Sequence, residues 1–253
     1  MTAASPPQPA MPDVRRLPAS APFGWLAAGW RDYCAHLLPS TFYGLCFATM
    51  GWLIVFTFRN AYEYVSALVT GFFLVGPFFA IGLYDLSRRR ERGLPGGLAP
   101  TLDAWRGNMG AIGMFGLVLG IVLLVWARAS LIVFALLYTG EMPNVAGFVG
   151  QVVSIENIEF LVAYVCVGGF FALLVFAISV VSVPMLLDRN TDGVVAVVTS
   201  LRAVGANLPA MFVWGAIIVA LIAAGFALYF VGLVVTVPVI GHATWHAYRA
   251  LIE

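Results

Sequence analysis

The chain has 253 residues, of which 62% are hydrophobic and only 10% are charged, and its formal net charge is +1. Its mean hydropathy of +0.96 lies far above that of a soluble domain. This composition predicts a polytopic membrane protein. It excludes a nucleic-acid partner, because phosphate binding needs concentrated positive charge on an exposed domain. The expected partners are membrane lipids and other integral membrane proteins.

The N-terminal stretch MTAASPPQPAMPDVRRLPAS is rich in Pro, Ala and Ser and has no apolar core of its own. Such a composition is typical neither of a secretory signal nor of a packed element. We therefore expect a disordered cytoplasmic tail over residues 1–22 and a single integral membrane domain over residues 23–253.

Apolar runs that cross about 30 Å of hydrocarbon need about 20 residues each. Four such runs are clear. A fifth tract, Pro209 to Tyr248, is about twice that length, so we divide it near Tyr229–Gly232 into two helices joined by a tight turn. The predicted fold is all-α, with about six transmembrane helices. They cover residues 39–58, 64–83, 110–137, 160–187, 209–229 and 232–248.

Three short segments resemble one another: WRDYCAH (Trp30–His36), LDAWRGN (Leu102–Asn108) and LRAVGAN (Leu201–Asn207). Each carries an arginine, ends in His or Asn, and is followed by an apolar run. The pattern predicts three pseudo-repeated hairpins of two spans, each preceded by a short interfacial helix. The alternative is that the segments look alike only because every membrane interface makes the same demands.

Proline and glycine recur inside the predicted spans. Pro77, Pro184 and Pro238 fall in the second span of each hairpin, where a lost backbone hydrogen bond is expected to kink the helix. The glycines of GFFLVGP and the pair Gly168 and Gly169 are expected to allow close packing between helices.

The arginines predict the orientation, because positive charge is retained on the cytoplasmic side. Most of them precede or follow predicted hairpins, which places both termini in the cytoplasm of a bacterial cell, with the chain in its inner membrane. The run Arg88, Arg89, Arg90 and Arg92 is most simply a retention signal of this kind. Binding of anionic lipid headgroups is the alternative function for this run.

Three blocks of sequence resemble a known family: GFFLVGPFFAIGLYDLSRRRERG, VVSVPMLLDRNTDGVVAVVTSLRAVGANLPAM and PVIGHATWHAYR. They are similar to signature blocks of bacterial predicted integral membrane proteins, domain-of-unknown-function family twenty-one eighty-nine. The resemblance extends from Trp25 onward. Some members are labelled cytochrome c oxidase subunits, which implies an accessory role beside a respiratory complex. A catalytic oxidase subunit is excluded, because haem and copper ligation needs several histidines within the spans.

The segment GHATWHAYR carries two of the three histidines, His242 and His246, one helical turn apart. His36 is expected at the same membrane surface, so the three imidazoles, with a carboxylate such as Asp32 or Asp85, are candidates for a zinc or haem site. The simpler interpretation, which we favour, is an interfacial belt in which these histidines and the neighbouring aromatic residues contact lipid headgroups. No cofactor is then expected.

Arg128 lies within the third apolar run, where a charge is costly and marks a candidate intramembrane polar site. Counting about 1.5 Å per residue places it near the outer boundary of the membrane. There it is expected to reach the headgroups or to pair with Glu156 or Glu159 rather than to line a substrate path.

The sequence contains no Walker phosphate loop, no Rossmann fingerprint, no H-E-x-x-H and no G-x-S-x-G. We therefore expect no enzyme. The leading hypothesis is a non-catalytic membrane protein that assists the assembly or stability of a respiratory or other membrane complex. A permease or channel for an uncharged or lipid-like solute, and a histidine-dependent metal or redox protein, are the two alternatives.

Overall fold

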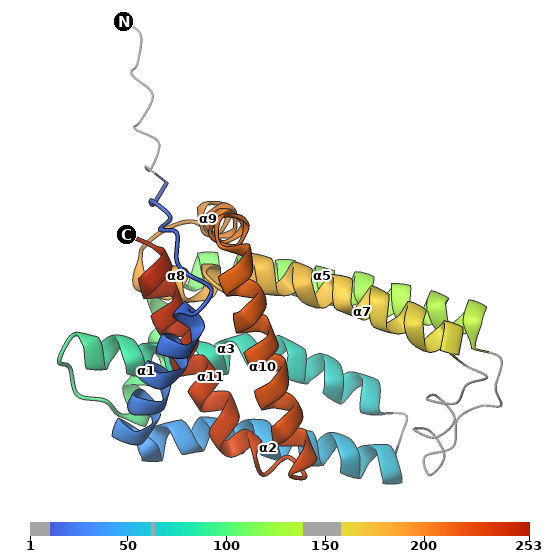
Figure 1. Ribbon diagram of the computed structural model, residues 1–253. Helices are drawn as coiled ribbons and strands as arrows, with labels where there is room; N and C mark the ends of the chain where they lie inside the picture. The colour runs from blue at the N-terminus through green and yellow to red at the C-terminus, as the bar shows by residue number, and fades with distance from the viewer. Residues whose placement is uncertain (1–10, 62–63, 139–157) are drawn as a thin grey trace, which may run out of the picture.

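The structure is a computed structural model that describes residues 11–61, 64–138 and 158–253. Every named element in these ranges is a helix, which confirms the all-α prediction (Figure 1). The helices are α1 (Ala21–Ala35), α2 (Leu37–Asn60), α3 (Val65–Glu91), α4 (Leu98–Leu102), η2 (Ala104–Asn108), α5 (Met109–Leu137), α7 (Ile158–Ser179), α8 (Ser182–Asp188), α9 (Gly193–Ala206), α10 (Leu208–Ala227) and α11 (Leu233–Leu251).

Four helical stretches among the described residues are long and apolar enough to cross a membrane. They are Leu37–Asn60, Leu98–Leu137, Ile158–Asp188 and Leu208–Ala227. The predicted spans 64–83 and 232–248 fall on α3 and α11, which are helical but are not among these four. The chain is thus an integral membrane protein with several candidate spans.

Two helix pairs project in the same direction from a more compact end of the molecule (Figure 1). Helix α2 runs beside α3, and α5 runs beside α7. We call these pairs the two arms. Helices α10 and α11 contact each other, and α11 also contacts α1, α2 and α3. The compact end is therefore built around α11, and the arms extend away from it.

The predicted span 160–187 is interrupted, because α7 ends at Ser179 and α8 begins at Ser182. Pro184 explains the break, since its ring clashes with the carbonyl of the residue four positions earlier and it has no N–H to donate. By contrast, α3 continues through Pro77 and α11 continues through Pro238. A proline in a predicted span therefore ends the helix at only one of these three positions.

The last residues of the three repeated segments share one backbone conformation. His36, Asn108 and Asn207 have φ and ψ of −122° and 45°, −143° and 48°, and −130° and 33°. Each residue is the N-cap of a long helix: His36 follows α1, Asn207 follows α9, and Asn108 is the last residue of η2. The shared geometry supports a structural basis for the repeat, beyond the likeness of the letters.

The segment before α1 lies against the C-terminus. Val14 and Ile252 form an isolated antiparallel bridge, and the Arg15 N–H donates to the Leu251 carbonyl at 2.8 Å. The Asn207 side chain accepts from the Leu17 N–H at 2.7 Å. The predicted tail covers residues 1–22: residues 1–10 lie outside the described part, whereas the chain from Asp13 to Leu17 is held by hydrogen bonds.

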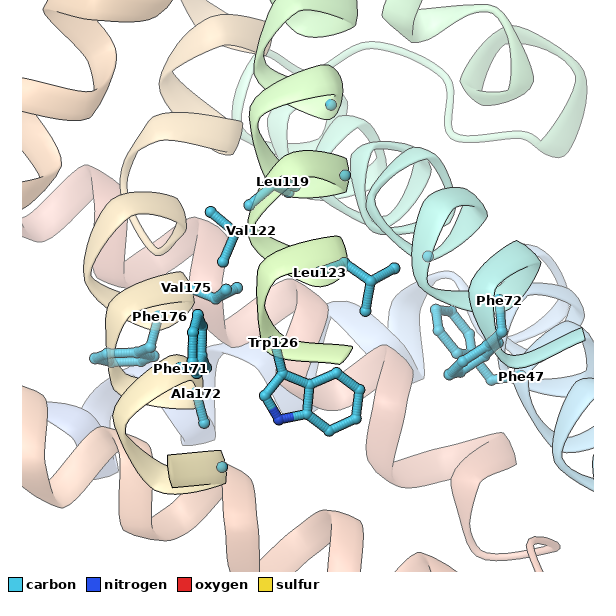
Figure 2. A pocket seen from close by; sticks show the side chains of 14 residues that line it. Phe47, Phe72, Leu119, Val122, Leu123, Trp126, Phe171, Ala172, Val175 and Phe176 are labelled. Carbon is cyan, nitrogen blue, oxygen red and sulfur yellow. The ribbon is translucent and has the colours of Figure 1, made fainter. Parts of the chain in front are cut away.

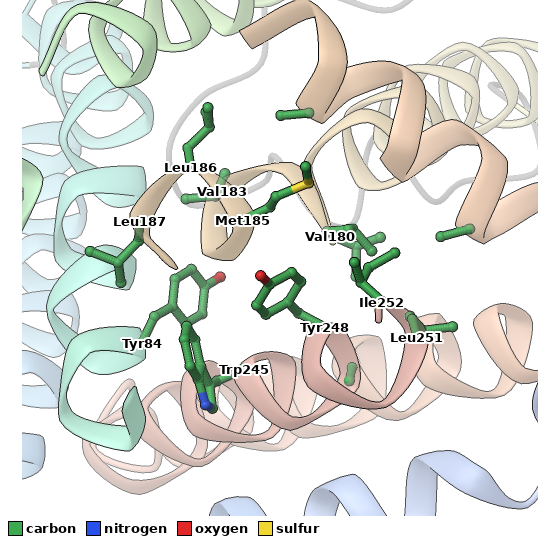
Figure 3. Close-up of a cluster of buried hydrophobic side chains, with 14 of the residues drawn as sticks. Tyr84, Val180, Val183, Met185, Leu186, Leu187, Trp245, Tyr248, Leu251 and Ile252 are labelled. Atoms are coloured by element: carbon green, nitrogen blue, oxygen red, sulfur yellow. The ribbon is translucent and has the colours of Figure 1, made fainter. Parts of the chain in front are cut away.

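The main hydrophobic core lies at the compact end, where α8 meets α3 and α11. Figure 3 shows side chains of α8 facing the rings of Tyr84 on α3 and Tyr248 on α11. Tyr248 and Trp214 are fully buried, and Trp245 is 1% exposed. Three large aromatic side chains are thus buried in the core where the helices converge.

Candidate functional site

His242 is completely buried between α2, α3 and α11. Its Nε2 lies 2.9 Å from Ser40 Oγ and its Nδ1 lies 2.8 Å from Ser87 Oγ. A neutral imidazole has one N–H donor and one acceptor nitrogen, so one serine accepts and the other donates. Both ring nitrogens are therefore engaged by hydroxyl groups of the same chain.

His246, one turn further along α11, bonds to a buried carboxylate on α1. Its Nε2 lies 2.8 Å from Asp32 Oδ2, and Arg90 Nη1 of α3 lies 2.7 Å from Asp32 Oδ1. Burial would raise the pKa of Asp32, but hydrogen bonds from His246 and Ser87 and the electrostatic influence of the neighbouring imidazoles hold it below its usual value. The carboxylate is thus stabilised in its ionised form.

The arginine run is bound by carboxylates of the chain itself. Arg88 and Arg89 both pair with Asp85, whose side chain is completely buried, with Nε to oxygen distances of 2.9 and 2.7 Å. Arg90 pairs with Asp32, and Arg92 pairs with Asp188 at 2.8 Å. The four arginines of the predicted headgroup-binding cluster each have an internal anion as partner.

A second set of polar contacts joins α3, α8 and the end of α11. Asp188 accepts from the Tyr248 hydroxyl at 2.9 Å. Glu91 accepts from Trp245 Nε1 at 3.1 Å and from Arg249 Nε at 3.0 Å. Together with the groups above, these residues form what we call the polar base. It comprises Asp32, Ser40, Asp85, Ser87, Arg88, Arg89, Arg90, Glu91, Arg92, Asp188, His242, Trp245, His246, Tyr248 and Arg249.

The interfacial-belt interpretation of GHATWHAYR is wrong for its largest side chains. His242 and Tyr248 are fully buried and Trp245 is 1% exposed, so they contact protein and not lipid headgroups. The tertiary contacts of α11 with its neighbours cover this face. Only His246 and Arg249, with side chains 30% and 41% exposed, reach the surface.

The three histidines do not converge on one point. His36 Nδ1 lies 3.3 Å from the Asp32 carbonyl of its own helix, and the ring also lies next to Gly96. Within residues 11–61, 64–138 and 158–253, no group of three or more His, Cys, Asp or Glu side chains is placed to hold a metal ion. A carboxylate beside a histidine was expected, and Asp32 beside His246 is the pair that the structure forms.

Arg128 is exposed on α5. Glu156, one of its two expected partners, lies outside the described residues. Glu159, the other, is exposed at the start of α7, and no ion pair joins it to Arg128 within the described part of the chain. The charge therefore points away from the helix contacts.

An apolar cleft of about 600 Å³ separates the two arms. Phe47 and Phe72 lie on one side of it and Phe171 on the other, with Leu123 and Trp126 of α5 between them (Figure 2). Phe47 packs edge-to-face against Phe72, with ring centroids 5.6 Å apart. On α5, Ile112 and Phe115, both in its first two turns, are the buried residues, so the arms diverge beyond that point.

The expectation of close helix packing is wrong for Gly76 and Gly168, which face the cleft. A Cβ added at either position would meet no atom within 4 Å, and the same holds at Gly116, for which no packing role was predicted. The glycines that do permit close approach lie elsewhere: a Cβ at Gly29 would come within 2.6 Å of the Ala243 nitrogen, and one at Gly44 would collide with the backbone of Val234. The glycines of the cleft thus leave open space, whereas Gly29 and Gly44 allow the backbone of α11 to approach closely.

Sequence reasoning missed Ser40 and Ser87 as partners of His242. Both serines lie at the ends of apolar runs, where a hydroxyl is unremarkable by itself. The sequence signal for a buried polar site was Asp85 inside the apolar stretch AIGLYDLS, because a buried carboxylate requires a partner. The partners follow it directly in the sequence, as Arg88 and Arg89.

The long apolar helices of the two arms, together with a polar base whose charges pair within the chain, define an integral membrane protein. Residues 65–188 match the model of a family described as predicted integral membrane protein (DUF2189). This part of the chain, from α3 to α8, belongs to that family. The first of the three sequence blocks lies inside the match, the second begins inside it and the third lies beyond it. The comparisons with curated proteins and with solved structures gave no match.

Proposed function

We propose that the protein is a non-catalytic membrane protein that supports other components of the membrane, for example the assembly or stability of a respiratory or other membrane complex. The observation that carries the proposal is the polar base. Its carboxylates and imidazoles, the groups that acid–base or metal chemistry uses, are bonded to serines, arginines and aromatic donors of the same chain.

The contacts of the polar base fit a structural role. Asp85 is fully buried with two arginines around it, and His242 is fully buried with a hydroxyl at each nitrogen. Such an arrangement joins helices, since an unpaired buried charge or polar group is costly. A group held in this way is not exposed to a substrate.

We further propose six membrane crossings in three hairpins, with both termini on the cytoplasmic side of a bacterial inner membrane. The common conformation at His36, Asn108 and Asn207 supports the threefold repeat. The turn at Tyr229 and Phe230 then lies on the outer side. Cysteine introduced at Tyr229, which is 82% exposed, should react with an impermeant maleimide added outside intact cells. Labelling only after lysis would contradict this topology.

The accessory role is tested by deleting the gene and quantifying membrane complexes on native gels. The expected result is a lower level of at least one complex, restored by the unmodified gene. A gene that carries Asp103→Asn serves as a control in this complementation. Asp103 pairs with Arg106 at the surface, and both exposed side chains lie outside the polar base. Unchanged levels of all complexes after deletion would contradict the proposal.

A second candidate function is a permease or channel for an uncharged or lipid-like solute. The cleft between the arms favours it, because the cleft is apolar and has the volume of a ligand pocket, which is about 300–1,000 Å³. Uptake of such a solute into proteoliposomes, compared with empty liposomes, tests this candidate.

A further inference from the structure

The cleft between the arms is separate from the polar base and takes no part in the role proposed for that base. Its walls come from all four helices of the two arms. Rings of Phe47, Phe72, Trp126 and Phe171 border a space between the described parts of the four helices (Figure 2). We infer that this cleft binds the hydrocarbon chain of a membrane lipid.

The depth of the cleft supports a hydrocarbon ligand. Along α5, at about 1.5 Å per residue, Gly116 lies about 10 Å and Trp126 about 25 Å from Met109. Both distances fall inside a hydrocarbon layer of about 30 Å. A gap at this depth is in contact with lipid chains, and a headgroup would lie outside it.

The lining of the cleft has the chemistry of an acyl-chain site. Among the described residues, its lining consists of Phe, Leu, Val, Ala, Gly and Trp, none of which is charged. Phe47 is held in place by edge-to-face contacts with Phe72 and Phe79, at centroid distances of 5.6 and 5.8 Å. A preformed wall of this kind binds an apolar chain by contact area and shape.

The glycines set the shape of the space. At Gly76 on α3, Gly116 on α5 and Gly168 on α7, the position of a Cβ has no atom within 4 Å. In a membrane protein, small residues normally allow two helices to touch. Here they face a gap on three different helices, so they widen the cleft beyond what the described residues occupy.

A transmembrane helix from another protein is the competing occupant, because Gly116 and Gly120 have the spacing that promotes helix association. Size decides against it. A 20-residue helix, 10–12 Å wide and 30 Å long, has a volume of about 2,400–3,400 Å³, so a cleft of about 600 Å³ takes in only part of such a helix. A single lipid chain enters such a cleft sideways from the bilayer without moving the arms.

The inference is tested with a phospholipid that carries a diazirine in one acyl chain. The intact protein is reconstituted in nanodiscs of phosphatidylethanolamine and phosphatidylglycerol that contain this lipid, irradiated, and mapped by mass spectrometry. Labels are expected to concentrate on Leu123, Trp126 and Phe171. Labels spread evenly over exposed residues of the outer faces, such as Phe212 and Leu173, would show only annular lipid and overturn the inference.

Two variants compare lipid labelling of a filled cleft with that of an open cleft. The change Gly116→Leu with Gly168→Leu places side chains in the open space and should lower labelling of the cleft by about tenfold, because it displaces several methylene contacts. The control is Gly215→Leu on α10, which also has open space at its Cβ and does not line the cleft. It should label like the unmodified chain.

Equal cleft labelling in the double variant and the control would overturn the inference. So would peptide-to-peptide cross-links, from a diazirine amino acid placed at Leu123, to a second copy or to another membrane protein. The labelling map of the unmodified chain decides the matter if the double variant does not purify as a monodisperse protein. The inference does not rest on the accessory role, since lipid labelling and the levels of membrane complexes are measured separately.

Discussion

The polar base and the two arms are built from opposite kinds of contact. In the base, Asp85 and His242 are fully buried, and each has at least two hydrogen-bond or ion-pair partners. In the arms, Gly116 and Gly168 face empty space. Lipid fills space around an apolar helix at little cost, but an unpaired buried charge has no such substitute. The difference teaches that this fold is held together at one end.

Loss of the buried carboxylate in the base should have the largest effect. Asp85→Asn leaves Arg88 and Arg89 without their counter-charge, and breaking a buried ion pair costs about 3–5 kcal/mol. The free energy of unfolding in mixed detergent and SDS micelles measures this loss. The matched change Asp103→Asn removes an exposed pair and should cost about 1 kcal/mol or less. Equal losses in the two variants would mean that the buried pairs of the polar base stabilise the fold no more than an exposed pair does.

The two histidines of α11 should differ in the same assay. His242→Ala leaves the Ser40 and Ser87 hydroxyls without the ring and opens a cavity, for a loss of about 2–4 kcal/mol. His246→Ala leaves Asp32 paired with Arg90, so about 1 kcal/mol is expected. Metal analysis of both variants and the unmodified protein accompanies the measurement. Stoichiometric metal that disappears in either variant would replace this structural role by a metal site.

One substitution made in both regions compares their packing directly. Gly44→Ala puts a methyl group against the Val234 backbone and should destabilise by about 1–3 kcal/mol. Gly116→Ala adds a methyl group in open space and removes a helix-breaking residue, so stability should stay equal or rise by up to about 1 kcal/mol. If Gly116→Ala destabilised as much as Gly44→Ala, the arms would be packed as closely as the base.

The pH dependence of the base should be the smallest effect. The pKa of Asp32 lies below its usual value, so the unfolded chain binds a proton more readily than the folded chain. The stability from this group is present above the ordinary pKa of about 3.9 and falls as the pH drops through the lower folded value. Unfolding titrations should therefore lose an Asp32-dependent component only below about pH 4. A change of stability with pH between pH 5 and pH 7 that disappears in Asp32→Asn would contradict the assignment.

Much of the fold could be predicted from hydropathy. Runs of about 20 apolar residues predict helices wherever they occur, and each of the six predicted spans coincides with helical structure. The sequence could not predict that the helix breaks near Pro184 but continues through Pro77 and Pro238, because the surroundings decide whether a helix tolerates a proline. The site was harder still, because Ser40, Ser87 and His242 are far apart in the chain.

The sequence by itself determined the class of protein, the approximate positions of the long apolar helices and the repeated ends at His36, Asn108 and Asn207, because these depend on local composition and spacing. Only the tertiary structure decided the fate of the polar residues. The same letters that suit a headgroup belt, His242, Trp245 and Tyr248, are buried by neighbouring helices. Glycines that suit close packing instead border a cleft. Burial depends on which surfaces meet, and that is set by contacts between residues distant in the chain.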